Sequence, residues 1–520
     1  MRRSPLVLVS LLLASFAINV DTTIVNVALP TFVRELHASN SQLQWIVDAY
    51  NLVFASLLLA AGSISDRVGR KGVLLVGLGV FGLASIAGGL TTTADQLIVA
   101  RCFMGAGAAM VFPATLSIIS NVFTGRAERA RAIGLWGATA GMAIALGPVV
   151  GGALLEHHSW TSIFFAMAPI AAVAAALVAW NVPTSRDPRA PKADRPGFVL
   201  ATSAMAVLVF TVIEAPNYGW SSAHSVAGFA IAAGLLSAFI VWERHVEAPM
   251  LDVSLFLNPR FTAACGSVTV AFFTLSGFIF LVTQYFQFFR HYGPLSTGVH
   301  MLPVAFAVGV GSVVGTKLAV RFGTKLVVTA GLVGVAGFYF WASTDVTGTE
   351  YTTIAVQMVI FGIGMGFTSA PATEAILGVV PRHKAGVGSA VNDTTRLLGS
   401  TLGVALIGSI YASLYGSRLV AGMPVQLPRN LVHVARGSVG AALAVAQGLN
   451  AHGGTGLGVS VLNAATQAFH RGLSVGCLVA GGFALAGAVM VVVFLPAHPE
   501  RSSEETPSPP QPLPVPVLAD

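Results

Sequence analysis

Two short stretches, in corresponding places of the two halves of the chain, indicate its fold. Residues 62–71 read Gly-Ser-Ile-Ser-Asp-Arg-Val-Gly-Arg-Lys, and residues 317–325 read Lys-Leu-Ala-Val-Arg-Phe-Gly-Thr-Lys. The pattern Arg-x-Gly-x-Lys is common to both, whereas Val320 replaces Asp66 in the second copy. Each stretch separates two long apolar runs, so we expect a short turn between helices that span a membrane. The chain therefore contains an internal repeat.

The composition excludes an ordinary soluble protein. The chain has 520 residues, of which 55% are hydrophobic and 9% are charged, whereas soluble domains carry roughly 25% charged residues. The net charge of +7 does not indicate a nucleic-acid-binding protein, because the basic residues lie in short loops between apolar runs. Cys102, Cys265 and Cys477 all fall within apolar runs, and we expect buried free thiols rather than disulfides.

The apolar runs predict an all-α integral membrane protein. A membrane-spanning helix needs about 20 mostly apolar residues, and the chain contains fourteen such runs. They lie near residues 5–29, 43–63, 72–91, 95–118, 131–154, 160–181, 197–215, 223–242, 261–288, 295–319, 325–343, 351–378, 386–413 and 468–495.

The distribution of Lys and Arg predicts the orientation. Twenty of the 28 basic residues fall in the tails and in the loops on the same side as the N-terminus, and six fall on the opposite side. By the positive-inside rule, both termini are expected in the cytoplasm, with the protein in the inner (cytoplasmic) membrane.

The repeat predicts two pseudo-symmetric six-helix bundles, residues 1–182 and 261–497. The linker 183–260 contains the two extra central spans. Transporters built from such halves bind their substrate between them.

Two further segments have a distinct composition. The outer loop 414–467 is rich in Gly and Ala, and we expect one short amphipathic helix near 431–449. Residues 498–520 form a Pro-rich cytoplasmic tail. A tail of this composition is expected to be disordered.

These motifs resemble the major facilitator superfamily, in particular its fourteen-span drug:proton antiporter branch. Residues 62–71 are similar to its loop motif after the second span, and residues 21–30 to its first-span motif. Residues 101–107 are similar to its fourth-span motif, with Met104 where Gln is usual. The fifth-span exporter motif is matched by Gly134, Gly147, Pro148, Gly151 and Gly152.

The resemblance implies an exporter that works by alternating access, because the family's importers generally lack the fifth-span motif. Thr161 and Met167 stand where that branch usually has Arg and Asn, which weakens close analogies of substrate. The glycines and Pro148 predict a close contact and a bend between spans five and eight of the twelve-span core. The alternative is ordinary small-residue packing.

Three charged residues inside the spans are candidates for proton coupling. Counting along the helices at 1.5 Å per residue places Asp21, Asp48 and Arg101 at similar depth in the outer half of the membrane. A low dielectric disfavours an ionised carboxylate and a nearby Arg favours it, so we expect Asp21 to carry the proton, ahead of Asp48. The alternatives are a static Asp21–Arg101 pair that only pins helices, and an interfacial Asp48.

The loop motif predicts a conformational latch. A carboxylate can cap a neighbouring helix and a cation can bind last-turn carbonyls, and the resemblance implies that these contacts hold the outward-open state. The alternative is a simple topology signal. The residues concerned are Gly62, Asp66, Arg67, Gly69, Arg70 and Lys71.

Aromatic and polar residues within the spans are candidates for a substrate pocket. Aromatic rings with a few amides suit flat, lipophilic compounds, cationic ones among them. The alternatives are membrane-interface or lipid-facing packing, and simple pairing of Asp393 with Arg396. The candidates are Trp45, Tyr50, Asn51, Gln284, Tyr285, Gln287, Phe288, Asn392 and Arg396.

The sequence therefore predicts a proton-coupled exporter of drugs, antibiotics or lipophilic secondary metabolites. We expect a monomer whose partners are protons, its small-molecule substrate and the lipid bilayer, with no nucleic acid. No phosphate-binding loop, metal-ligand spacing or nucleophile motif is visible, so neither a cofactor nor an enzyme activity is expected. The alternatives are a proton-coupled importer of a nutrient or siderophore on the same fold, and a non-transporting membrane sensor.

Overall fold

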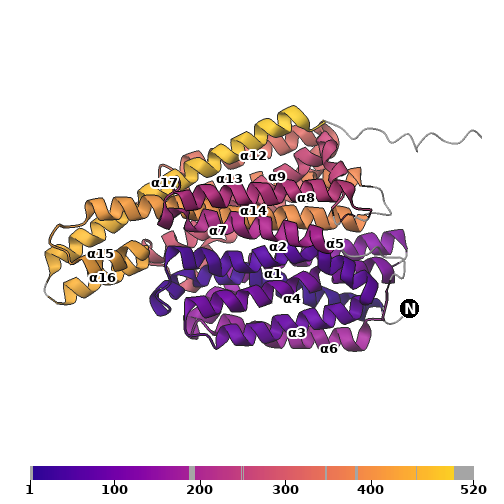
Figure 1. The fold of residues 1–520 in the computed structure, drawn as a ribbon, viewed down its shortest axis with the longest axis horizontal. Helices are drawn as coiled ribbons and strands as arrows, with labels where there is room; N and C mark the ends of the chain where they lie inside the picture. The colour runs from indigo at the N-terminus through magenta and orange to yellow at the C-terminus, as the bar shows by residue number, and fades with distance from the viewer. Residues whose placement is uncertain are drawn as a thin grey trace, which may run out of the picture.

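The protein is all-α in the part of the chain that the structure describes (Figure 1). This computed structural model describes residues 4–123, 125–186, 194–247, 249, 251–345, 348–380, 385–452 and 454–496. The helices are α1 (Ser4–Glu35), α2 (Asn40–Val68), α3 (Arg70–Gly89), α4 (Ala94–Val122), α5 (Arg126–His157), α6 (Ser162–Asn181), α7 (Arg195–Tyr218), α8 (Ala223–His245), the 3-10 helix η1 (Val253–Leu257), α9 (Pro259–Phe288), α10 (Pro294–His300), α11 (Leu302–Phe322), α12 (Thr324–Ala342), α13 (Tyr351–Val379), α14 (Ala385–Gly422), α15 (Arg429–Gly437), α16 (Val439–Ala451) and α17 (Thr455–Phe494).

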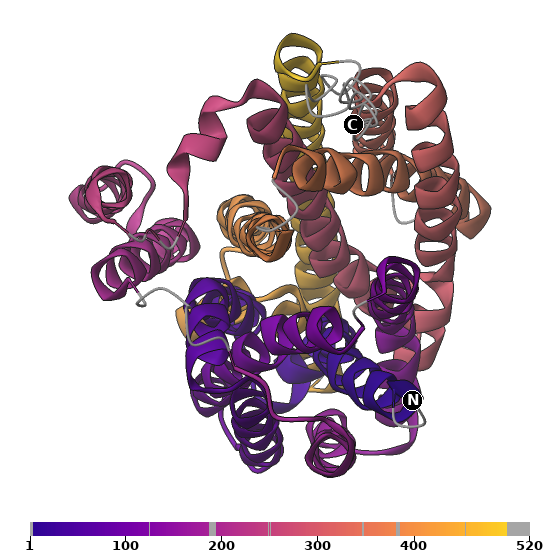
Figure 2. The same cartoon turned by 90° about the vertical axis from the view of Figure 1, so that its right-hand side faces the viewer.

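The long helices form two packed groups. Helices α1 to α6 pack against one another and are called the first bundle, and α9 to α14 with α17 form the second bundle. Figure 2 looks roughly along the helix axes and shows the two bundles side by side. They meet where α1, α2 and α5 contact α9, α14 and α10, and we call this contact the seam.

Helices α7 and α8 form a hairpin at the edge of the two bundles (Figure 2). α7 contacts α2 of the first bundle and α14 of the second. Asn217 Nδ2 donates to Ser41 Oγ at 3.1 Å, and Trp220 Nε1 donates to Ser413 Oγ at 3.0 Å. The hairpin is therefore attached to both bundles.

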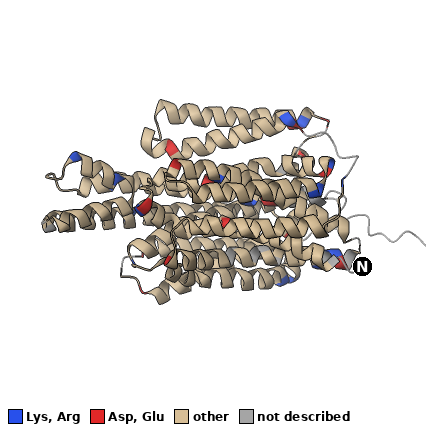
Figure 3. Ribbon diagram, turned by 90° about the horizontal axis from the view of Figure 1, so that it is seen from below, with Lys and Arg blue, Asp and Glu red and all other residues tan. Residues whose placement is uncertain are grey.

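The surface and helix lengths are those of a membrane protein. Twelve helices in the described part are long and apolar enough to span a membrane, or thirteen if the two parts of α2, bent by 49°, count as one. α5 is also long but is not among them, so the expected fourteen spans are not confirmed. Large apolar side chains such as Leu83 and Phe306 face outward, as a lipid-facing surface requires. Charged residues gather toward the two ends of the helices (Figure 3).

The repeated turn of the sequence has the same backbone form in both bundles. Gly69 joins α2 to α3 with φ of 134°, and Gly323 joins α11 to α12 with φ of 89°. Residues with a side chain rarely adopt positive φ, which explains why both copies have glycine at this point.

The segment predicted as a loop, 414–467, is mostly helical. α14 continues to Gly422, α17 begins at Thr455, and α15 and α16 lie between them. The prediction of one helix near 431–449 is wrong, because this segment contains two helices, α15 and α16. The extended backbone of Ser438 separates them, and the Ser438 side chain caps α16. Apolar contacts among Leu427, Ala446 and Val461 hold the segment together. We call residues 414–467 the arm.

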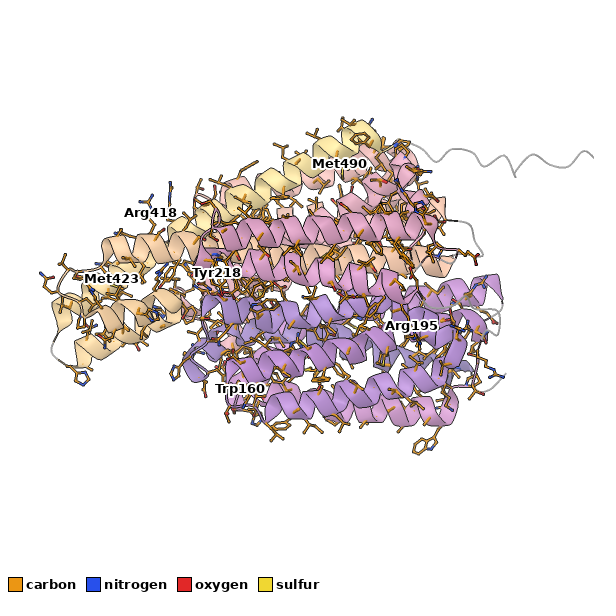
Figure 4. The ribbon with its side chains drawn as sticks, viewed as in Figure 1. Trp160, Arg195, Tyr218, Arg418, Met423 and Met490 are labelled. Atoms are coloured by element: carbon orange, nitrogen blue, oxygen red, sulfur yellow. The ribbon has the colours of Figure 1, made fainter. Side chains whose placement is uncertain are left out.

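The arm protrudes from one end of the molecule, and this end is called the arm face. The opposite end, where α1 begins, is called the N-terminal face (Figure 1). Figure 4 shows Arg418 and Met423 in the arm, Tyr218 near the arm face and Arg195 toward the N-terminal face. The tail 498–520 and residues 187–193 of the linker lie outside the described residues.

Candidate functional site

A buried ion pair joins α1 to α4. Arg101 Nη1 lies 2.6 Å from Asp21 Oδ2, and both side chains are 1% exposed. Arg101 Nε also donates to the backbone carbonyl of Ile46 at 3.0 Å, and its guanidinium lies 4.2 Å from the centre of the Tyr50 ring. Arg101 thus holds α1, α2 and α4 together, and a change in the charge of Asp21 would disturb all three helices.

Asp48 is buried without a partner. Both of its carboxylate oxygens are buried and lack a hydrogen bond within the described residues. Gln44 and Asn51 precede and follow it by four and three residues, so the three side chains share one face of α2. Gln44 Oε1 accepts a hydrogen bond from Ser409 Oγ at 3.1 Å, so this face of α2 meets α14. An ionised carboxylate here would be a buried charge without compensation.

The seam is closed toward the arm face. Gln287 Nε2 donates to the carbonyl of Val27 at 2.8 Å. The backbone N–H of Leu295 donates to Glu156 Oε2 at 3.4 Å. With the α2–α14 bond described above, these are three hydrogen bonds between the bundles in the part of the chain that the structure describes, and all three lie in the arm-side halves of their helices.

Glycines of α5 allow close packing on both sides of this helix. A Cβ at Gly151 would lie 2.6 Å from Ile24 Cγ1 of α1, and one at Gly152 would lie 2.5 Å from the carbonyl oxygen of Pro294 in α10. Gly147 lies against Thr23, and Pro148 against Gly298.

Gly134 differs from the other glycines of this motif. It is exposed, and nothing lies within 4 Å of a Cβ placed there. It lies in the half of α5 toward the N-terminal face and points away from α4, on which the nearby Trp136 packs through the Phe112 ring at 4.8 Å.

The contact expected of the exporter motif was with span eight of the twelve-span core, the run 295–319 that begins with α10. Pro148 and Gly152 make contacts with α10, whereas Gly147 and Gly151 contact α1.

The aromatic pocket candidates of α2 do not lie together. The ring of Trp45 packs against Phe210 of α7 at 6.2 Å, away from the seam, whereas Tyr50 is buried behind Arg101. Five residues on a helix correspond to a rotation of about 140°, so the two rings face different neighbours. Gln44 was missed by the sequence reasoning, although its spacing to Asp48 was a usable signal.

The candidates on α9 divide in a similar way. Gln284 and Gln287 are buried and each has an unpartnered side-chain oxygen. Tyr285 instead packs near Phe469 of α17, at 6.5 Å between ring centres, and Phe288 lies against Gly440 of the arm. Only the two amides combine burial with unsatisfied polar atoms, as a polar site at the seam requires.

The polar cluster of α14 stays within the second bundle. Asn392 Oδ1 accepts from Thr373 Oγ1 at 2.9 Å. Asp393 pairs with Arg396 at 3.7 Å, and the Arg396 guanidinium lies 4.5 Å from the centre of the Phe272 ring. The geometry thus matches simple pairing, which was the alternative for these residues.

The loop motif makes its contacts inside the first bundle. Asp66 Oδ1 accepts from Arg70 Nε at 2.7 Å and from Ser117 Oγ at 2.9 Å. Lys71 Nζ donates to the carbonyl of Ala179, in the last turn of α6, at 2.7 Å. A last-turn carbonyl is thus bound as expected, but by Lys71 rather than by Arg67, which is exposed.

The chain is similar to known membrane transporters. The model of the Major Facilitator Superfamily matches residues 11–404. The multidrug efflux pump LfrA of Mycolicibacterium smegmatis is 34% identical, with 94% of this chain and 96% of LfrA covered. The methyl viologen resistance protein SmvA of Salmonella typhimurium is 33% identical, with 94% and 98% covered.

A solved structure shares the fold. It is a bacterial homologue of the human lysosomal transporter Spinster, in an inward-facing and occupied conformation. Its sequence is 15% identical, the alignment covers 95% of this chain and 98% of that one, and the TM-score is 0.68. At this identity the likeness concerns the fold alone.

Proposed function

Since the chain belongs to the Major Facilitator Superfamily, we propose that it is a proton-coupled exporter of drugs or other lipophilic compounds. The names of its relatives support this proposal: two are called efflux or resistance proteins, and the tetracenomycin C resistance and export protein of Streptomyces glaucescens is 30% identical over 94% of this chain. The protein would act in the inner membrane of a bacterium, as a monomer.

The proposed topology has fourteen spans. These are α1 to α9, α10 with α11, α12, α13, α14 and α17. The first bundle corresponds to residues 1–182 and the second to 261–497, with the α7–α8 hairpin inserted between them. The surplus of basic residues at the N-terminal face supports a cytoplasmic location for that face, which puts the arm outside.

The observation that carries the proposal is the pair of unequal carboxyls next to the seam. Asp21 has its counter-ion at 2.6 Å, and Asp48 has none among the described residues. We therefore propose Asp48 as the group that carries the proton in this conformation, which reverses the order expected from the sequence. Asp21 and Arg101 would form the network that responds when Asp48 gains or loses its proton.

Alternating access would then act through the seam. Because the seam is closed on the arm side, the substrate path would open toward the cytoplasmic face. None of the three hydrogen bonds described above lies on that side. Opening outward requires those bonds and the α5–α10 packing to break. Asp66, whose hydrogen bonds among the described residues stay within its own bundle, would engage the second bundle in the opposite state as the latch.

Proton entry provides enough energy for export. One elementary charge crossing 100 mV is worth about 2.3 kcal/mol, which supports a gradient of roughly fifty-fold for a neutral substrate. The pH gradient adds to this.

The test is substrate-driven proton release from acid-loaded everted vesicles that contain the protein. We expect lipophilic cations and hydrophobic antibiotics to release protons in a saturable manner, and vesicles without the protein to show no release. Accumulation of a nutrient together with protons would establish the importer instead. Absence of any saturable flux across a broad panel would contradict a transport function.

A further inference from the structure

A cavity of about 640 Å³ lies outside the seam, between α2 and the α7–α8 hairpin. Its walls include Trp45 of α2, Phe210 of α7 and Ile231 of α8. The rings of Trp45 and Phe210 are 6.2 Å apart and inclined by 44°. The volume is that of an ordinary small-molecule site, and two aromatic faces are available to a flat ligand.

The cavity contains one carboxylate. Glu214 lines it and accepts a hydrogen bond from Asn217 Nδ2 at 2.8 Å. No cationic side chain pairs with Glu214 among the described residues. Glu214 lies four residues before the end of α7 at Tyr218, which is about 6 Å along the helix. Its charge is thus held near the membrane boundary of the arm side, facing an apolar groove.

Small residues of α8 line one wall of the groove, and an aromatic stack at the hairpin turn closes one end. The wall on α8 includes two small residues, Ala227 and Gly228, and Gly228 packs directly against Thr211 of α7. At the hairpin turn, the ring of Tyr218 stacks on His224 at 5.5 Å. A side chain at position 228 would collide with Thr211, whereas Ala227 is exposed and lines the groove.

We propose that this groove is a second binding site, for an amphiphilic cation with an aromatic body, such as a quaternary ammonium or phosphonium compound. The body lies against the wall formed by Trp45 and Phe210, since aromatic rings attract a cation, and the charge lies against Glu214. A phospholipid would fill the apolar part but bring its phosphate toward the Glu214 carboxylate, which repels it. This site goes beyond the proposed function, since it lies outside the seam and needs no proton coupling.

The experiment measures protection of a reporter thiol in the full chain. Ala227→Cys places the thiol in the groove, in a Cys102→Ala background that leaves the buried Cys265 and Cys477 in place. The protein is held in phosphatidylcholine nanodiscs and labelled with a maleimide, with or without tetraphenylphosphonium. A second reporter, Val425→Cys, lies on the exposed surface of the arm and controls for general effects on labelling.

We expect tetraphenylphosphonium to slow labelling at position 227 and not at position 425. Glu214→Gln keeps the acceptor for Asn217 but removes the charge, so it should raise the half-protecting concentration about tenfold, or about 1.4 kcal/mol. Glu350→Gln removes an exposed charge at the N-cap of α13 and should change nothing. Neutral tetraphenylmethane should protect weakly.

Three results would overturn the proposal: no protection by the cation, equal protection by the neutral compound, or a Glu214→Gln variant that is protected as well as the parent. If phosphatidylglycerol in the nanodisc already blocks labelling and the cation has no further effect, the groove is a lipid-binding site. That result would also overturn the proposal. Labelling does not depend on transport. Failure of vesicle export would therefore leave protection intact, and failure of protection would leave export intact.

Discussion

Replacing Asp48 by Asn separates proton coupling from folding. The carboxyl has no partner within the described residues, and an ionised group so placed would cost several kcal/mol. A neutral amide of similar size therefore changes the free energy of unfolding by no more than about 1 kcal/mol. It cannot release a proton, so the driving force of roughly fifty-fold per 100 mV is lost, although substrate can still move down its own gradient.

The assay follows both processes in the same everted vesicles. We expect Asp48→Asn to bind substrate and equilibrate it, while substrate-driven proton release falls to the background of empty vesicles. Asp95→Asn is the matched control, because Asp95 is exposed and accepts a bond from Gln42, which an amide oxygen can also accept. Normal proton release by Asp48→Asn would refute the reasoning and return the coupling role to Asp21.

Three further predictions concern stability and packing. Arg101→Met leaves a buried carboxylate unpaired, so we expect a loss of about 3–5 kcal/mol and a lower melting temperature; an unchanged melting temperature would show that the pair does not stabilise the fold. Gly152→Ala places a Cβ 2.5 Å from the α10 backbone, so export should fall, whereas Gly134→Ala meets open space and should export normally; equal rates in vesicles would contradict the proposed closure. Burial raises the pKa of Asp345 above its ordinary 3.8, against the lowering by the Gln357 hydrogen bond. The folded state is therefore destabilised as pH rises through that value, and Asp345→Asn should melt higher at neutral pH with a gain that vanishes below pH 3.8; a gain independent of pH would refute the assignment.

The sequence located the ion pair because depth in a membrane is a one-dimensional property. Asp21 and Arg101 were placed at similar depth by counting residues from the ends of their spans, and the structure brings them to 2.6 Å. The same counting applied to Asp48, but it could not tell that this carboxyl has no partner. Whether the Asp48 carboxyl has a hydrogen-bond or ionic partner depends on the rotation of α2 about its axis. That rotation is decided by the helices that pack against α2.

The aromatic candidates illustrate the same difference. Trp45 and Tyr50 were grouped because they are close in the sequence, yet one packs on α7 and the other on Arg101. The arm was underestimated because its low charge and many glycines resemble a loop. Its helices depend on contacts such as those of Tyr415, whose hydroxyl lies 3.2 Å from the carbonyl oxygens of both Ala435 and Ser438 and shares its one hydrogen between them.

The sequence by itself determined the class of protein, the position of most helices, the repeated glycine turn and the depth of the intramembrane charges. These follow from local hydrophobicity and from the steric demand of positive φ, which neighbours do not alter. Only the tertiary structure decided which face of each helix meets the seam, that the seam is closed toward the arm, and that the α7–α8 hairpin encloses a groove with Glu214. The physical reason is that these features arise from packing between helices far apart in the chain.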